Sequence, residues 1–265
     1  MAMFSRRVCP ECGHSYDDRL SCCPVCKRDN EIRPKDNLLY LPISHELALF
    51  LIGLIGLNAI SIIVSLFFVN MAKEDEVLAV LLINSISYLI ILLIDIILLR
   101  KYFRDFLSYF KKWQSYAFGL LGGIILIVSS FTISYIMEML IPSASTGGNQ
   151  STIISMVNTN PIASIIVLAF IGPFTEELAY RVGLYTLLAR KSKILAYIVT
   201  ALIFAAIHID FFSNNFINEL AALPDYLIAG LLFCLIYDLK GFGASFIAHM
   251  ANNLFAVILI IIQGA

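Results

Sequence analysis

Residues 47–70 read LALFLIGLIGLNAISIIVSLFFVN and contain no charged side chain. Because a helix rises 1.5 Å per residue and the hydrocarbon core of a bilayer is about 30 Å thick, about 20 apolar residues span a membrane. This stretch therefore predicts a transmembrane helix. Of the 265 residues in the chain, 60% are hydrophobic and 14% are charged, whereas soluble domains contain about 25% charged residues. The composition excludes a water-soluble globular protein.

Six more apolar runs follow the first. The fourth run has Gly172 and Pro173 in its middle, where we expect a kink or a split in the helix. The fifth and sixth runs are short for complete spans. The sequence thus predicts an all-α polytopic membrane protein with about seven to eight transmembrane helices. The seven runs cover residues 47–70, 77–99, 116–141, 162–189, 194–209, 226–239 and 242–262.

The basic residues fall on one side of the predicted spans. Loops rich in Lys and Arg stay in the cytoplasm, and with residues 1–43 placed inside, 16 of the 18 Lys and Arg residues lie in inner segments. The two others are Lys73, in an outer loop, and Arg181, within an apolar run. We therefore expect a multi-pass protein of the cell membrane with a cytoplasmic N-terminus. The net charge of −1 gives no reason to expect nucleic acid as a partner.

Two CxxC pairs near the N-terminus predict a metal site formed by Cys9, Cys12, Cys23 and Cys26. Each short turn brings two thiolates together, and two such turns complete the tetrahedral four-sulfur shell of a structural zinc ion. Cys22 and His14 are alternative ligands, but the CxxC spacing favours Cys23. A pair of disulfides would conflict with a cytoplasmic position and with the five cysteines of this segment.

This cysteine-rich segment resembles the short zinc ribbons of many bacterial membrane proteins. We expect a zinc ribbon at residues 1–29, a polar linker at 30–46 and a transmembrane domain at 47–265. A four-sulfur site has no open coordination position, so the zinc would be structural. The ribbon would then serve as a docking module, with a protein as its possible partner. The short ribbon and the absence of a targeting signal favour a bacterial plasma membrane.

The fourth apolar run contains three ionisable residues, each of which costs about 2.5 to 3.5 kcal/mol at the centre of a bilayer. They are Glu176, Glu177 and Arg181. Glu177 and Arg181 are four positions apart on one helical face, which predicts a structural ion pair. Glu176 points about 100° away from that face. It has no such partner, so we interpret it as a functional residue.

Three more polar residues lie in later apolar runs at similar depths. Counted from the nearest inner basic residue, Glu176 lies about 21 Å deep, His208 about 22 Å and Asn253 about 20 Å. His249, one turn before Asn253, lies about 13 Å deep. Three helices thus bring polar groups close to one level of the bilayer, which argues for a site.

These residues resemble the signature of the CAAX prenyl-protease and bacteriocin-processing family of intramembrane peptidases, also called the Abi family. The signature consists of EExxxR, FxxxH and HxxxN, each on a membrane helix. The chain has all three in order: Glu176-Glu177 with Arg181, Phe204 with His208, and His249 with Asn253. The resemblance covers about residues 115–262, the expected peptidase core, and does not include the ribbon.

The resemblance implies that Glu176 and His208 activate the hydrolytic water, while His249 and Asn253 stabilise the oxyanion. Buried carboxylates make effective general bases, and amide and imidazole N–H groups can stabilise a developing oxyanion. Glu177 and Arg181 would support this arrangement. Glu176, His208 and His249 could instead bind a catalytic zinc ion with a water. Because a carboxamide such as Asn253 is a poor zinc ligand, we expect a site without a catalytic metal.

The function predicted is therefore an intramembrane endopeptidase that acts on a membrane-associated peptide or protein, with the lipid bilayer as its surroundings. A non-catalytic scaffold or regulator of the same fold is the first alternative, although no signature residue is missing from the chain. A transporter is the second alternative. It would predict Gly- or Pro-interrupted helices in two related halves, and only one such helix is found.

Overall fold

A computed structural model describes residues 6–20, 22–28, 37–144 and 146–264. Within these residues, six helical spans are long and apolar enough to cross a membrane. They confirm a polytopic all-α protein. The spans are Ile43–Ser65, Glu76–Leu99, Trp113–Leu140, Pro161–Ala189, Phe216–Lys240 and Phe242–Gly264.

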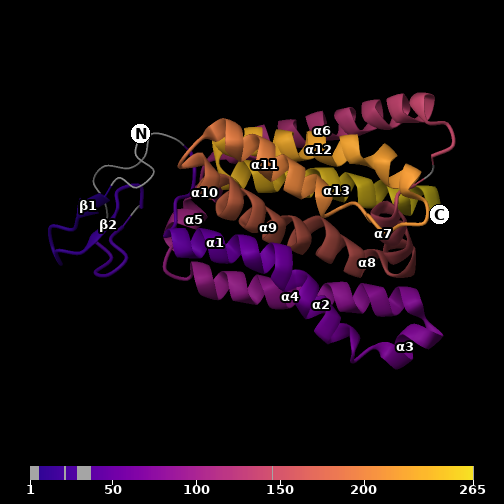
Figure 1. Cartoon of the computed structure of the whole chain (residues 1–265), viewed down its shortest axis with the longest axis horizontal. Coiled ribbons are helices and arrows are strands. Elements are labelled where there is room, and N and C mark those ends of the chain that lie inside the picture. Colours follow the sequence, from indigo (N-terminus) through magenta and orange to yellow (C-terminus); the bar gives the residue numbers. More distant parts are fainter. Residues whose placement is uncertain (1–5, 21, 29–36, 145, 265) are drawn as a thin grey trace.

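The helices lie side by side along the long axis of the molecule, with the two-stranded ribbon at one end (Figure 1). The helix α13 packs against α6 and α12, and α1 packs against the π-helical segment η3. The elements that precede Pro161 are β1 Arg6–Val8, β2 Ser15–Asp17, α1 Ile43–Leu51, η1 Ile52–Gly56, α2 Leu57–Ser65, α3 Val69–Glu74, α4 Glu76–Leu99, α5 Phe103–Phe110, α6 Trp113–Leu140 and α7 Gly148–Thr159. The later elements are α8 Pro161–Ser164, η2 Ile165–Ile171, α9 Gly172–Glu177, η3 Leu178–Tyr185, α10 Thr186–Ala189, α11 Lys193–Ala206, α12 Phe216–Lys240 and α13 Phe242–Gly264.

The fourth span is one helix and not two, although its sequence predicts a kink or split at Gly172 and Pro173. Two π-helical segments, η2 and η3, flank the short α-helix α9, which has 6 residues. Pro173 lies in the first turn of α9, directly after η2. Proline lacks an N–H group and its ring collides with a carbonyl four residues earlier in a regular α-helix, whereas a π-helical turn is wider. The chain therefore continues through Pro173.

The two short apolar runs belong to helices of different lengths. The run at 194–209 forms α11, which has 14 residues and is shorter than the six spans. The run at 226–239 is part of α12, which has 25 residues and begins at Phe216. Pro224 lies inside α12, where sequence alone favours a boundary. Extension of α12 beyond this proline gives it the length of a complete span.

Close packing between α1 and η3 depends on Gly183. A Cβ atom at this position would lie 2.8 Å from the backbone nitrogen of Phe50 and 2.9 Å from the carbonyl oxygen of Glu46. Contacts this short would force the backbones apart. The absence of a side chain at Gly183 thus lets the first span lie directly against the helix that carries Glu176 and Glu177.

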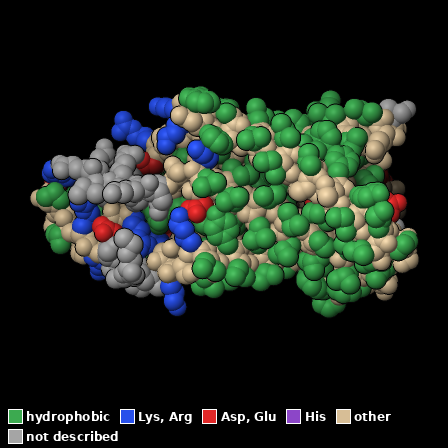
Figure 2. Space-filling view, turned by 90° about the horizontal axis from the view of Figure 1, so that it is seen from above, with side chains coloured by type: hydrophobic (Ala, Val, Ile, Leu, Met, Phe, Trp, Pro, Cys, Tyr) green, Lys and Arg blue, Asp and Glu red, His purple; other side chains and the backbone are tan. Residues whose placement is uncertain are grey.

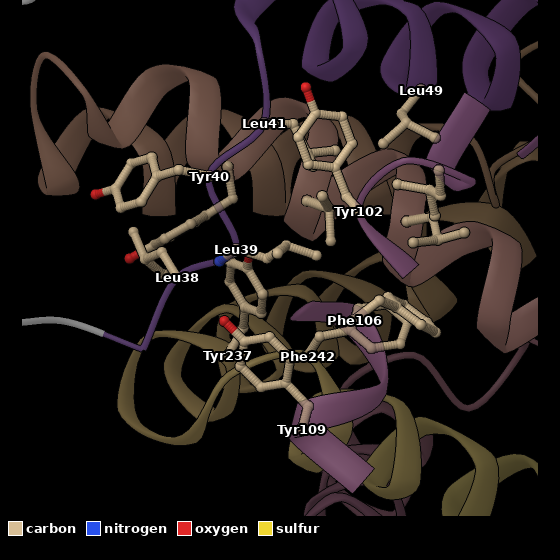
Figure 3. Close-up of a cluster of buried hydrophobic side chains, with 14 of the residues drawn as sticks. Leu38, Leu39, Tyr40, Leu41, Leu49, Tyr102, Phe106, Tyr109, Tyr237 and Phe242 are labelled. Carbon is tan, nitrogen blue, oxygen red and sulfur yellow. Dashed lines mark hydrogen bonds between the residues drawn. The ribbon is translucent and has the colours of Figure 1, made fainter. Parts of the chain in front are cut away.

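The segment Leu38–Leu41 is buried and belongs to the largest hydrophobic core (Figure 3). The backbone N–H of Leu39 donates a hydrogen bond of 3.1 Å to the hydroxyl of Tyr237. The first helix begins at Ile43, earlier than the predicted residue 47. Of the predicted linker 30–46, residues 30–36 lie outside the described part of the chain, and residues 38–41 pack against the membrane domain.

Arg190 joins the ribbon to the membrane domain. Its side chain is fully buried and forms two hydrogen bonds to the carboxylate of Glu46, with lengths of 2.8 and 2.6 Å. It also forms an ion pair with Asp17 of the ribbon and donates to the carbonyl of Leu41 at 2.8 Å. Burial opposes its charge, but the hydrogen bonds to Glu46 and the charge of Asp17 outweigh burial and raise its pKa. Arg190 follows α10 directly, so the ribbon contacts the end of the fourth span.

Candidate active site

Glu177 and Arg181 form a fully buried ion pair. Nη1 of Arg181 lies 3.3 Å from Oε1 of Glu177, and neither side chain is exposed. The guanidinium carbon lies over the rings of Phe204 and Phe233, 4.6 and 4.9 Å from the ring centroids. The i, i+4 spacing predicted this pair, and the two aromatic faces add cation–π attraction to it.

Glu177 also orients His249. Its Oε1 atom lies 3.0 Å from Nδ1 of His249, and its Oε2 atom accepts a hydrogen bond from the hydroxyl of Ser245. A carboxylate only accepts hydrogen bonds, so Nδ1 carries the proton in this contact. The imidazole stacks on Phe233 at a centroid distance of 4.3 Å. Glu177 thus determines which nitrogen of His249 is turned away from it.

Glu176 lies on the other face of α9 and is partly exposed. Its Oε1 atom accepts a hydrogen bond of 3.0 Å from the hydroxyl of Tyr88 on α4. Its Oε2 atom lies 3.7 Å from Nε2 of His249. The side chain of Glu176 lines a small pocket that is partly open. The pocket is lined by Gly53, Leu57, Tyr88, Ile91, Thr175, Glu176, Ala179, Tyr180 and Ile207.

His208 follows the end of α11 and is held in one orientation. Its Nδ1 atom lies 2.7 Å from the carbonyl oxygen of Phe204, which can only accept, so Nδ1 carries the proton and Nε2 has a free lone pair. Its ring stacks on Tyr226 of α12 at 4.6 Å. The ring of Phe204 packs against both imidazoles, 4.8 Å from that of His208 and 6.0 Å from that of His249.

Asn253 lies one turn after His249 on α13. Its Nδ2 group donates a hydrogen bond of 2.9 Å to the carbonyl of Leu168 in η2, and its Oδ1 atom accepts one of 3.3 Å from Asn252. One N–H of the amide is therefore engaged by the fourth span. The other N–H has no partner among the hydrogen bonds formed by the described residues.

The structure brings four of the predicted residues into direct contact: Glu176, Glu177, Arg181 and His249. His208 joins them through the shared packing of Phe204. The carboxylate of Glu176 faces His249, whereas the family resemblance pairs Glu176 with His208. The two hydroxyls that donate to these glutamates, those of Tyr88 and Ser245, escaped prediction. Ser245 lies four residues before His249 on one face of α13, a spacing that could have indicated it, whereas the sequence holds no signal for Tyr88.

The four cysteines of the two CxxC pairs form one cluster. Their sulfur atoms all lie within 4.8 Å of one another, with 3.4 Å between Cys9 and Cys26 and 3.6 Å between Cys12 and Cys23. A tetrahedral zinc ion with Zn–S bonds of about 2.3 Å requires sulfur atoms about 3.8 Å apart. The backbone amide of Cys12 lowers the pKa of the Cys9 thiol to about 6. These residues can hold one metal ion.

Cys22 and His14, the alternative ligands, are not part of this cluster. Cys22 is buried in the largest hydrophobic core together with residues of the membrane domain. It therefore contributes to the contact between the ribbon and the helices. The choice of Cys23 from the CxxC spacing agrees with the structure.

The helices define a polytopic membrane protein, and carboxylate and imidazole groups from several of them lie close together between the helices. Residues 158–255 match the family described as Rce1-like, type II CAAX prenyl endopeptidase Rce1-like. This match supports the family that the three motifs predict, the CAAX prenyl-protease and bacteriocin-processing family. The matched residues include all six predicted residues of the site but not the ribbon.

One curated relative also matches the chain. Over 128 residues, the chain is 24% identical to the UPF0177 protein YvdC of Lactococcus lactis subsp. lactis (strain IL1403). The match covers 48% of this chain and 46% of the relative, so it spans about half the length of each. No solved structure matches the chain.

Proposed function

We propose that the chain is an intramembrane endopeptidase that hydrolyses a peptide bond in a membrane-associated peptide or protein. The observation that carries this proposal is the position of Glu176. One oxygen of its carboxylate is held by Tyr88, the other faces His249, and Glu176 lines a pocket between helices. A carboxylate in such a place can take a proton from a water molecule next to a bound peptide bond.

In the proposed reaction, Glu176 accepts a proton from water while the water oxygen attacks the carbonyl carbon of the peptide. The free lone pair on Nε2 of His208 orients the same water. When the C–N bond breaks, the proton held by Glu176 passes to the leaving amine. The products are a new carboxyl group and a new amino group, so atoms and charge balance.

His249 and Asn253 would stabilise the oxyanion of the tetrahedral intermediate. His249 would donate from Nε2, the nitrogen that is turned away from Glu177 and lies 3.7 Å from Oε2 of Glu176. Asn253 would donate its second amide N–H from one turn away. Loss of one oxyanion donor typically lowers kcat about 10² to 10³-fold, so Asn253 contributes to the rate without being indispensable.

A site without a catalytic metal fits this arrangement better than a zinc site. Among the described residues, only the four ribbon cysteines bring three or more ligand atoms within 4.8 Å of one another. Glu176, His208 and His249 are not gathered to that degree. Asn253 also suits an oxyanion better than a zinc ion. We therefore propose a glutamate mechanism, with zinc in the ribbon as a structural ion.

Metal analysis of the purified full-length protein tests both parts of this assignment. We expect about one zinc ion per chain, since four thiolates form one closed site. A Cys9→Ser, Cys12→Ser double variant should lose this ion, while His249→Ala should keep it. Two zinc ions per chain, one of which is lost in His249→Ala, would replace the glutamate mechanism with a zinc mechanism.

We also propose that the ribbon end of the molecule is cytoplasmic, in a bacterial plasma membrane. Lys and Arg side chains gather at that end, whereas hydrophobic side chains cover much of the face in Figure 2. A thiol reagent that cannot cross membranes should label Lys73→Cys in intact cells and leave Lys191→Cys at the background of the wild type. The reverse labelling would invert the orientation.

The substrate can be sought by comparison of the membrane peptides of cells that contain the wild-type protein or the Glu176→Gln variant. A peptide that stays uncleaved only in the variant identifies a substrate. A quenched fluorescent peptide with a prenylated cysteine near its C-terminus is a suitable probe, because the matching family is described as prenyl endopeptidases. Identical peptide profiles and no cleavage of the probe would favour a non-catalytic scaffold.

A further inference from the structure

Tyr88 is the residue from outside the three motifs that touches the proposed base. It lies on α4, well before the matched residues 158–255 in the sequence. Its hydroxyl donates a hydrogen bond of 3.0 Å to Oε1 of Glu176. The donor must be the phenol, because an ionised carboxylate has no proton to give. Hydrogen bonds to a charged acceptor are about twice as strong as neutral ones.

The ring of Tyr88 lines the pocket beside Glu176. Gly172 of the fourth span is a neighbour of this ring, because a Cβ atom added there would lie 3.7 Å from Cζ of Tyr88, at ordinary van der Waals distance. The span thus leaves room for about one methyl group next to the ring. The hydrogen bond to Glu176 is therefore the contact that fixes the hydroxyl.

We propose that Tyr88 is a positioning residue for the catalytic carboxylate of Glu176. The terminal torsion of a glutamate is broad, so a carboxylate without a donor samples many orientations. With Oε1 held by Tyr88, Oε2 is directed toward Nε2 of His249, 3.7 Å away. This distance is too long for a direct hydrogen bond, and Oε2 keeps lone pairs for the hydrolytic water. This inference rests on the proposed function.

Tyr88 also makes the site depend on a helix outside the matched region. The carboxylate comes from α9, the facing imidazole from α13 and the phenol from α4. A displacement of α4 would release Oε1 of Glu176 without any change in α9. The helix α4 is thus part of the catalytic assembly, and its distance from α9 affects the orientation of the base.

The test compares Tyr88→Phe with a matched loss of a hydroxyl, Tyr116→Phe. Tyr116 lies on α6, and its hydroxyl donates to the carbonyl of Phe110 at 3.0 Å, away from the site. Phenylalanine keeps the ring and its packing, so both variants should fold. Infrared spectroscopy of the full-length protein gives the first readout, in which the carboxylate band of Glu176 is the one absent from Glu176→Gln.

We expect Tyr88→Phe to shift this carboxylate band and Tyr116→Phe to leave it in place. In the prenylated-peptide assay, kcat of Tyr88→Phe should fall about 10- to 100-fold, because small misplacements of a reacting group have effects of this size. Its KM should stay within about twofold of the wild type, since the hydroxyl contacts Glu176 and not the substrate.

The outcomes distinguish a failure of the positioning role of Tyr88 from a failure of the proposed peptidase function. An unshifted band, or a shifted band with kcat at the wild-type value, overturns the positioning role of Tyr88. If Glu176→Gln is inactive while Tyr88→Phe is fully active, this inference fails and the proposed function remains. Full activity in Glu176→Gln overturns the proposed function, which removes the inference with it. The infrared readout is the position of the band and not its intensity, so it does not depend on the amount of active enzyme.

Discussion

The Glu176→Gln variant is expected to lose nearly all peptidase activity while it retains its fold. Glutamine has the size of glutamate and can still accept the hydrogen bond from Tyr88, but its amide cannot take a proton from water. Removal of a general base typically lowers the rate about 10² to 10⁴-fold. The measurement is cleavage of the prenylated peptide by purified protein, with thermal unfolding in detergent as the test of folding.

Glu138→Gln is the matched control for this substitution. Glu138 lies on α6, is exposed and does not line the pocket, so the same chemical change occurs outside the site. Activity and the unfolding midpoint should both equal those of the wild type. If Glu176→Gln were as active as Glu138→Gln, the carboxylate would be a structural feature and the scaffold alternative would replace the enzyme.

The second large effect is expected on stability, from Arg190→Met. Methionine fills part of the volume of arginine but removes the two hydrogen bonds from Arg190 to the buried carboxylate of Glu46, which keeps only the one from the backbone of Leu41. Removal of one partner of a buried ion pair typically costs about 3 to 5 kcal/mol. We expect a large fall in the unfolding midpoint in detergent, together with release of the ribbon, because Asp17 loses its partner as well.

Two further variants separate the ion pair from a loss of packing. Glu46→Gln combined with Arg190→Met removes both charges and should restore part of the lost stability. Lys191→Met changes an exposed neighbour and should have no measurable effect. A double variant as unstable as Arg190→Met alone would show that packing of the arginine, and not the unpaired carboxylate, controls the stability of the junction.

Much of the fold can be predicted because the bilayer demands long apolar runs. Residues 47–70 and 77–99 are recognisable as spans from length and composition alone. The start of α12 is not recognisable, since residues 216–225 include Glu219, Pro224 and Asp225. Glu219 accepts hydrogen bonds from the backbone of Gly148 and Asp210, and such tertiary partners make its burial possible.

In the candidate site, too, contacts between residues close in sequence can be predicted, whereas contacts between distant residues cannot. Helical spacing places Glu177 next to Arg181, and the two CxxC turns place pairs of sulfurs together, so sequence reasoning finds both. The contact between Glu177 and His249 joins residues 72 positions apart, and that between Tyr88 and Glu176 joins residues 88 positions apart. No periodicity encodes such contacts. They arise only when the helices pack.

The junction at Arg190 has a consequence for the order in which the newly made chain assembles. Glu46 precedes Arg190 by 144 residues and Asp17 precedes it by 173. Since ribosomes add about 5 to 20 residues per second, Glu46 waits about 7 to 29 seconds for its guanidinium partner. The ribbon is translated first, but it can dock only after most of the helices have been made. The N-terminal end of this protein is therefore among the last parts to reach its final place.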